Sequence, residues 1–424
     1  MKNLDFIIKN LEDLWRRRFR RMSKHRNLKV CLYNNAMKSF KRILSHEGTF
    51  FGALVFIFVL RVVYALSRDL FLSGPDAPFY GQAPLDFVKY GFWSSLIEGA
   101  PFYPLGYPAA LWPLAEVGGT KWIMLAQVTQ ILASISTVYF VYRISQMFLN
   151  NEVSKIVSFG FLLGPAFIPM SGQAMYETTL MFAFYLYLYL ILKVQNESRN
   201  HYVLACSGML AGFAAVIHPR VIPWIFAVQL ILLGGLGLKR SFVFFGFFLA
   251  PVVPFLIRNK IAHDVWTLSD AGGYWTNGIN LGSLGTLFKN GIWNAMYFWS
   301  PYSGDAKRGT WFHNFTLYHE IKKITQSTTF VILIATIFAL VSIIAWLLGS
   351  VLIIKSKMLI GSIILYVPLI AWATDFLTIG DSRHRLTVVP LLLIGQIYAF
   401  AWLQKKMFHK GSILRTQNKV QPAN

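Results

Sequence analysis

Charged residues, and acidic ones in particular, are scarce in this sequence. Only 14% of its 424 residues are charged, and 18 acidic residues stand against 40 lysines and arginines, while hydrophobic residues make up 55%. A soluble domain typically carries about 25% charged residues. Together with a mean hydropathy of +0.49, this scarcity excludes an ordinary soluble domain and predicts an all-α protein that crosses a membrane several times.

The sequence also has only two cysteines and no nucleotide-binding motif. Cys31 lies in a basic N-terminal arm and Cys206 in an apolar run, which excludes a disulfide framework. No glycine-rich phosphate loop of the P-loop or Rossmann kind occurs. Nothing in the sequence therefore indicates ATP or a nucleotide sugar, and no histidines and cysteines show the spacing of metal ligands.

The net charge of +22 is concentrated at the two ends of the chain and in short turns between apolar runs. That distribution is typical of cytoplasmic segments of membrane proteins and does not favour a nucleic-acid partner. In the arm, residues 1–49, apolar side chains at helical spacing oppose a basic face, which predicts an amphipathic helix on anionic membrane lipid. The alternative is a poorly ordered basic tail that only fixes orientation.

Ten apolar runs are long enough to cross about 30 Å of hydrocarbon, which takes roughly 17 to 25 residues. An eleventh run, 105–117, contains two prolines and is too short to cross, so we expect an interfacial or re-entrant helix there. With this choice every basic turn lies on the side of the basic arm. The ten predicted spans are 50–72, 121–142, 155–172, 176–193, 201–217, 220–238, 240–257, 329–354, 358–379 and 386–404.

This pattern predicts a transmembrane domain over residues 50–404 in the plasma (inner) membrane, with both termini in the cytoplasm. The segment 73–120 becomes the first outer loop and 258–328 a long outer loop, both periplasmic or extracellular, and 405–424 a basic cytoplasmic tail.

Ionisable and polar residues gather at the predicted outer ends of the spans. Charges are costly inside hydrocarbon, about 2.5 to 3.5 kcal/mol each at its centre, so they tend to mark sites. Carboxylates can accept a proton from a hydroxyl group, and arginine or lysine can hold a phosphate, which suits chemistry on a lipid phosphate. The residues are Asp76, Lys89, Glu177, His218, Arg220, Arg258, Asn259, Asp375, Asp381, Arg383, His384 and Arg385.

Each of these residues also has a structural interpretation. Asp76, in a loop rich in glycine and proline, fits a turn or helix-cap residue. Glu177 fits the first turn of a span, where an acid is favourable, and His218 before Pro219 fits a structural role equally well.

Two further charged residues are expected to be structural. Arg61, midway along the first span, should pair with a neighbouring helix, and Asp86 should be solvated or paired with Lys89.

The order of several motifs resembles the GT-C glycosyltransferases, over roughly residues 50 to 404. An acid in the first outer loop is followed four residues later by tyrosine (PDAPFY, Asp76 and Tyr80), and then comes an aromatic-proline segment, PFYPLGYPAALWPL. An acid opens the fourth span (MYETTL, Glu177). SGMLAGFAAVIHPR, PFLIRNKIAHDVWTLSDAGGYWTNGIN and RHRLTVVPLLLIG follow. Within that superfamily the sequence is most similar to the bacterial relatives of the protein O-mannosyltransferases and of the lipid A aminoarabinose transferase.

The resemblance implies transfer of a sugar from a polyprenyl-phosphate donor to a hydroxyl acceptor (lipid, glycan or protein) on the outer face, with inversion. It makes Asp76 the catalytic base. Glu177 matches the second acid, which orients the acceptor, binds the sugar or helps to coordinate a divalent cation, Mg²⁺ or Mn²⁺. Ala77 stands where many relatives carry an acid directly after the first, which makes a paired-acid metal site less favoured.

The lysine common in the aromatic-proline segment of relatives is replaced here by Phe102 and Tyr103. The donor phosphate is then expected at Arg258, Lys89, Arg220 or the cluster Arg383, His384 and Arg385. The residues expected at the substrate are Tyr80, Tyr103, His218 and Asn259. The alternatives are a flippase or transporter of lipid-linked sugars and an enzyme like the O-antigen ligases or polymerases.

Overall fold

A computed structural model describes residues 47–67, 71, 76–97, 99–100, 102–163, 171–196, 200–269, 328–377 and 387–408. Over these residues the protein is helical and contains no strand, which confirms the all-α prediction. The arm up to residue 46, the stretch 270–327, the cluster Arg383 to Arg385, Asp381 and the tail from residue 409 lie outside the described residues.

Every predicted span overlaps a helix. The helices are α3 (Glu47–Ser67), α6 (Trp122–Gln146), α7 (Asn151–Leu162), α9 (Tyr176–Asn196), α10 (His201–Ile217), α11 (Ile222–Leu236), α12 (Leu238–His263), α16 (Thr328–Ser356), α17 (Met358–Leu377) and α19 (Val389–Phe408).

Among the described residues, four segments are long and apolar enough to cross a membrane, namely Glu47–Ser67, Gly106–Gln146, Tyr176–Gln195 and Leu238–His263. They indicate a multi-pass membrane protein, whereas the number of ten spans and their orientation stay predictions. The helix α7 differs most from its predicted span. It begins at Asn151, where the Asn150 side chain accepts from the backbone N–H of Val153 at 2.8 Å, and it ends at Leu162.

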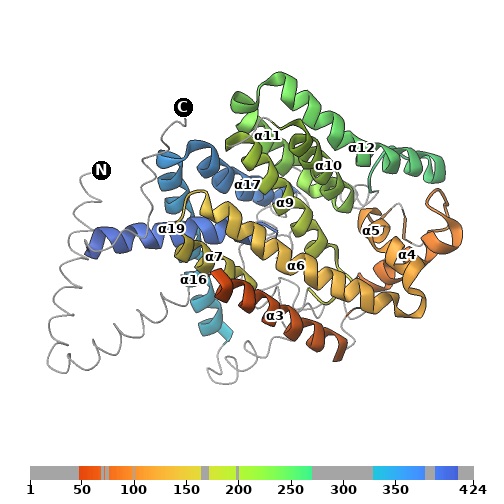
Figure 1. The fold of residues 1–424 in the computed structure, drawn as a ribbon, viewed down its shortest axis with the longest axis horizontal. Coiled ribbons are helices and arrows are strands. Elements are labelled where there is room, and N and C mark those ends of the chain that lie inside the picture. Colours follow the sequence, from red (N-terminus) through yellow and green to blue (C-terminus); the bar gives the residue numbers. More distant parts are fainter. Residues whose placement is uncertain are drawn as a thin grey trace.

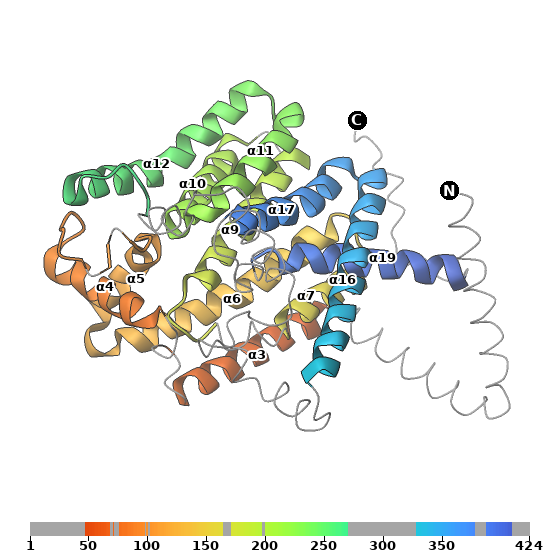
Figure 2. The ribbon, with the colours of Figure 1, turned by 180° about the vertical axis from the view of Figure 1, so that it is seen from behind.

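Two helices fall within the predicted first outer loop. These are α4 (Ala77–Tyr90) and α5 (Gly106–Gly118), and a short 3-10 turn, η3 (Gly119–Lys121), leads from α5 into α6. At 1.5 Å per residue, α5 is about 20 Å long, too short to cross the hydrocarbon. Figures 1 and 2 show α4 and α5 together at one end of the bundle, beside the C-terminal end of α12.

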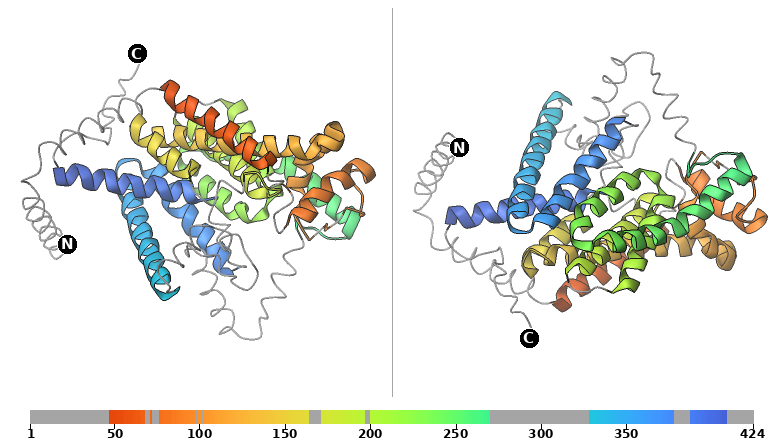
Figure 3. Two further views of the ribbon diagram at one scale, coloured as in Figure 1. Left: turned by 90° about the horizontal axis from the view of Figure 1, so that it is seen from below. Right: turned by 90° about the horizontal axis from the view of Figure 1, so that it is seen from above.

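The helices α6, α9, α10 and α12 pack in that order, each against the next. The C-terminal helix α19 packs against α16, which crosses it at the opposite end of the molecule from α4 (Figure 3). The backbones of α10 and α12 approach each other closely, because Gly212 on α10 has no side chain to keep them apart. A Cβ atom built on Gly212 would lie 2.1 Å from the carbonyl oxygen of Phe248.

Arg61 on α3 confirms the expected pairing with neighbouring helices. The guanidinium donates to the hydroxyl of Ser134 on α6 at 3.2 Å and to the backbone carbonyl of Leu162 at the end of α7. This buried cation thus ties three helices together.

We expect Gly212→Ala to lower the free energy of unfolding by about 1 to 3 kcal/mol, because the added methyl group forces α10 and α12 apart. The matched control is Gly246→Ala on α12, where a Cβ atom meets nothing within 4 Å. Thermal unfolding of the two detergent-purified variants checks this. Equal melting temperatures would show that the close approach of the helices contributes nothing to stability.

Candidate functional site

The segments that carry the two predicted catalytic acids are joined through their backbones. The N–H of Ala174 donates to the carbonyl of Phe71 at 2.7 Å. Phe71 precedes Asp76 by five residues and Ala174 precedes Glu177 by three residues. Two stretches about one hundred residues apart in sequence therefore meet at the point where each leads into its acid.

Two glutamines on α6 hold the stretch that leads into Glu177. The side-chain amide of Gln130 donates to the carbonyl of Met175 at 2.9 Å, and that of Gln127 donates to the carbonyl of Gly172 at 3.4 Å. Backbone groups outside a helix need such partners when they are buried. The position at which α9 begins is thus set by side chains from α6.

Tyrosine rings from three elements surround Tyr80, which is buried on α4. Its ring centroid lies 5.0 Å from that of Tyr107 on α5, 6.0 Å from that of Tyr103 and 6.1 Å from that of Tyr176 at the start of α9. Tyr103 in turn stacks on Phe79 at 4.4 Å. The predicted substrate residues Tyr80 and Tyr103 therefore belong to one aromatic cluster.

Both acids lie within electrostatic reach of Tyr80. Burial raises the pKa of its phenol well above the usual 10.0, and the neighbouring Tyr176, Asp76 and Glu177 raise this pKa further. Glu177 is only 1% exposed in the first turn of α9, whereas Asp76 is half-buried at the residue before α4. Tyr80 consequently stays neutral, with both acids close enough to act on its proton.

His218 and Arg220 extend this arrangement. The His218 ring stacks on Tyr176 at 4.5 Å between ring centroids. Its Nδ1 accepts from the backbone N–H of Arg220 at 3.3 Å, within the short turn η4 (Pro219–Val221) that follows α10. Arg220 is itself buried, and its backbone N–H ties it to His218 in a third part of the chain.

Arg258 and Asn259, near the end of α12, have protein partners instead. The guanidinium of Arg258 donates from Nε to the carbonyl of Phe92 at 3.2 Å and from Nη2 to that of Ser94 at 2.5 Å. Its Nη1 donates to Asn259 at 2.8 Å, and the Asn259 amide donates to the carbonyl of Thr267 at 2.7 Å. These two buried side chains hold the loop after α4 and the stretch after α12.

Lys89 lies apart from the aromatic cluster. It is exposed in the last turn of α4 with its ammonium 4.7 Å from the ring centre of Tyr90, whose hydrogen bond raises the lysine pKa. Thirteen residues of helix place it about 20 Å from Asp76 along the axis. Of the two expectations for Asp86, solvation is wrong, because Asp86 is buried and accepts a hydrogen bond from Gln82 at 2.8 Å. Its pairing with Lys89 stays a prediction, and the Asp86 charge contributes to the raised pKa of Lys89.

Metal ligands do not gather in the described part of the chain, where no three histidine, cysteine or acidic residues are grouped as a metal ion would require. Binding of a divalent cation stays a prediction, and Asp76 and Glu177 are the acids expected to take part in it. The proposed contribution of Arg383, His384 and Arg385 falls outside the described residues.

Sequence reasoning missed Tyr107, Tyr176 and Gln130. Tyr107 follows Tyr103 by four residues within the aromatic-proline segment, and Tyr176 directly precedes Glu177. Gln130 is polar within an apolar span, which is itself a sign of a structural or functional contact. Each signal was present in the sequence, but none says which residues the side chain meets.

A scan against models of protein families finds no matching family, and a search of curated proteins finds no match. The function is accordingly argued from the arrangement of these residues.

Replacing Arg258 with alanine should lower the free energy of unfolding by about 2 to 3 kcal/mol, because the carbonyls of Phe92 and Ser94 lose a charged donor. Limited proteolysis should also cut faster within residues 91–97. The control is Lys239→Ala on the same helix, whose side chain is exposed. Unchanged proteolysis and stability in Arg258→Ala would contradict this clamp.

Stability should fall as the pH rises above the usual tyrosine pKa of 10.0, because the unfolded chain then releases the Tyr80 proton while the folded chain keeps it. This linkage is worth up to about 1.4 kcal/mol per pH unit. We expect Tyr80→Phe to lose stability less steeply between about pH 9.5 and 11 in thermal melts. If stability fell equally steeply with pH in the wild-type protein and in Tyr80→Phe over this interval, the raised pKa of Tyr80 would be refuted.

Proposed function

We propose that this protein is an integral-membrane glycosyltransferase of the GT-C type. It moves a sugar from a polyprenyl-phosphate donor to a hydroxyl acceptor at the outer face of the membrane, with inversion at the anomeric carbon. The multi-pass helical architecture is compatible with a donor that arrives within the bilayer.

The observation that carries this proposal is that Asp76 and Glu177 both lie within electrostatic reach of Tyr80 in one aromatic cluster, which His218, two residues before Arg220, joins through Tyr176. Asp76, Glu177 and Arg220 come from the start of α4, the first turn of α9 and the turn after α10. The transfer of a sugar from a phosphate donor needs a carboxylate to take a proton and a cation to hold the leaving phosphate. Buried ionisable groups in a membrane protein favour a functional assignment.

In the proposed reaction the acceptor hydroxyl oxygen attacks the anomeric carbon of the donor. The bond from this carbon to the phosphate oxygen breaks, and polyprenyl phosphate leaves with the electron pair. Asp76 takes the proton of the attacking hydroxyl, a step typically worth about 10² to 10⁴ in rate. Its half-buried position leaves the carboxylate accessible to an acceptor, as a general base requires.

Arg220 is the cation best placed for the leaving phosphate, because it follows His218, which stacks on Tyr176 beside Glu177. Charge-assisted hydrogen bonds from arginine to phosphate are among the strongest available. Arg383, His384 and Arg385 remain further candidates. Arg258 is assigned to positioning instead, since three of its nitrogen atoms donate to protein oxygens.

Glu177 is assigned to the sugar. Its burial next to Tyr80 and His218 suits a carboxylate that accepts hydrogen bonds from sugar hydroxyls in a site closed to water. The half-buried Tyr103, stacked on Phe79, offers an aromatic surface for the sugar ring.

Asp76→Asn should reduce transfer by about 10²-fold or more, because the amide cannot take the proton of the acceptor. The measurement is release of free polyprenyl phosphate from purified polyprenyl-phosphate sugars, with and without an added acceptor fraction, by protein in detergent. Asp264→Asn is the matched control, because this exposed aspartate forms an ion pair with Lys260 at the end of α12.

Full activity in Asp76→Asn would overturn the assignment of the base. Movement of the intact donor across vesicles without release of polyprenyl phosphate would instead identify a flippase. Release that depends on the arginines but not on Asp76 would favour an enzyme like the O-antigen ligases.

A further inference from the structure

Two exposed tryptophans lie where the loop after α4 meets the end of α12. Trp93 is 53% exposed and Trp266 is 67% exposed. An indole ring is large and mostly apolar, with one polar N–H group, so it is best accommodated where one side is apolar and the other is wet. Neither residue is among those proposed to act on the substrate.

Arg258 fixes the backbone on both sides of Trp93. Its buried guanidinium donates to the carbonyl of Phe92 at 3.2 Å and to that of Ser94 at 2.5 Å. The ring of Phe92 also meets that of Phe255, one turn earlier on α12, with 5.1 Å between their centroids. The end of α12 therefore sets where Trp93 lies.

The next residue of α12 does the same for Trp266. The buried amide of Asn259 donates to the carbonyl of Thr267, directly after Trp266, at 2.7 Å. Asn259 in turn accepts from Arg258 at 2.8 Å. One pair of adjacent, hydrogen-bonded side chains thus holds both tryptophan segments.

Aliphatic side chains close to the two tryptophans in sequence are exposed as well. Leu96 is 66% exposed and Ile261 is 68% exposed. A sugar would require polar groups beside the rings to bond its hydroxyl groups. Exposed aliphatic and aromatic side chains together favour a lipid partner instead.

This surface continues the apolar side of α12. Leu249, Val253 and Ile257 are exposed and follow one another at intervals of four residues, so they share one side of the helix, and Ile261 extends the series. Because α12 is long and apolar enough to cross a membrane, these side chains contact lipid. The lipid-facing side of α12 thus reaches the last turn before Trp266.

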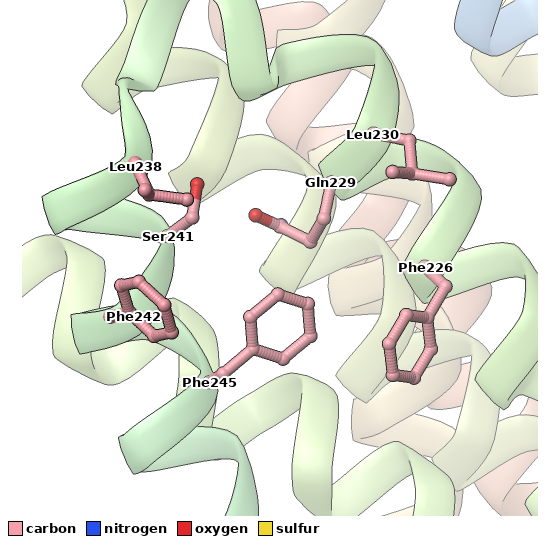
Figure 4. Close-up of a pocket in the computed structure, with 7 residues that line it drawn as sticks. All are labelled: Phe226, Gln229, Leu230, Leu238, Ser241, Phe242 and Phe245. Atoms are coloured by element: carbon pink, nitrogen blue, oxygen red, sulfur yellow. The ribbon is translucent and has the colours of Figure 1, made fainter.

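The start of α12 has the same character. Figure 4 shows a pocket between α11 and α12, near the turn at Gly237, whose lining is largely phenylalanine and leucine. Among the lining residues, Phe226, Leu230 and Phe242 are exposed. The helix is therefore apolar on its outside from its first turns to its last.

Charged side chains lie at the same end as the tryptophans. Lys89 is exposed in the last turn of α4, and Lys260 forms an exposed ion pair with Asp264 at the end of α12. Charges are costly in the centre of a bilayer, so this end does not lie there. Exposed apolar rings beside exposed charges are typical of the headgroup region, where tryptophan is enriched.

We propose that Trp93 and Trp266 anchor this end of the protein in the headgroup region of the bilayer. The partner is the lipid surface, and the hydrogen bonds of Arg258 and Asn259 set the depth at which the loop after α4 lies. The anchor does not depend on the proposed transferase activity.

The test places a fluorophore near each tryptophan and leaves both rings intact. The label is attached to Leu96→Cys or to Ile261→Cys, after Cys31→Ser and Cys206→Ser have removed the native thiols, and the full-length protein is placed in phosphatidylcholine nanodiscs. Three quenchers are compared, namely a lipid with a nitroxide on its headgroup, a lipid with a nitroxide near the end of its acyl chain, and iodide in the water.

We expect the headgroup nitroxide to quench both labels more strongly than either other quencher. A label on Leu249→Cys, within the apolar side of α12, is the reference for the hydrocarbon and should be quenched most by the acyl-chain nitroxide. Stronger quenching of the Leu96→Cys and Ile261→Cys labels by iodide would place the tryptophans in water and refute the anchor. Weak quenching by all three would refute it too, since another protein surface would then cover this end.

The contribution of the rings themselves is tested by combining Trp93→Gln with Trp266→Gln. This change should shift quenching of the Leu96→Cys label away from the headgroup nitroxide and toward iodide. Trp402→Gln on α19, whose ring lies 5.2 Å from the ammonium of Lys406, is the matched control and should leave the pattern unchanged. An unchanged pattern in the double variant would show that the tryptophans do not hold this end at the surface, contrary to the proposal.

Discussion

The arrangement of the candidate site depends on one requirement, that buried backbone groups outside the helices find hydrogen-bond partners. The stretch before α9 meets it through Gln130, Gln127 and the carbonyl of Phe71. The loop after α4 meets it through Arg258. Helices can satisfy their own backbones, but these connecting segments cannot. The places where they find partners therefore decide where Asp76 and Glu177 lie.

The same requirement explains why polar residues in the apolar helices divide into two kinds. Gln127, Gln130 and Arg258 use their donors on backbone carbonyls and are part of the scaffold. Glu177 and Arg220 are buried in the first residues of an element, and Glu177 acts electrostatically on Tyr80 from another element. In a medium of low dielectric constant such charge effects are strong.

The sequence was sufficient to predict the helical class, the positions of the apolar segments along the chain, the short helix over 105–117 and the pairing of Arg61. Hydrophobic length and the cost of a buried charge are local properties, so a single sequence expresses them. The site residues were predicted by type and position, and Tyr80, Tyr103 and His218 do lie in one aromatic cluster beside Glu177, with Arg220 two residues after His218.

What could not be predicted is the set of partners across the bundle. An arginine near the end of a span is compatible with a phosphate or with the carbonyls of Phe92 and Ser94, and only the packing of α12 against the loop after α4 distinguishes them. The burial of Asp86 likewise follows from which face of α4 is covered. The junction of Phe71 with Ala174 leaves no trace in either stretch alone. Those properties belong to pairs of distant segments.

The contacts of Arg61 carry a consequence for how the protein is made. Its two acceptors, on Ser134 and Leu162, lie 73 and 101 residues later in the chain. Translation at about 5 to 20 residues per second separates the synthesis of α3 from that of its second acceptor by roughly 5 to 20 seconds. Only Ser134 is synthesised before the end of this interval. The full set of contacts that ties α3 to α6 and α7 can therefore form only after α7 has been synthesised.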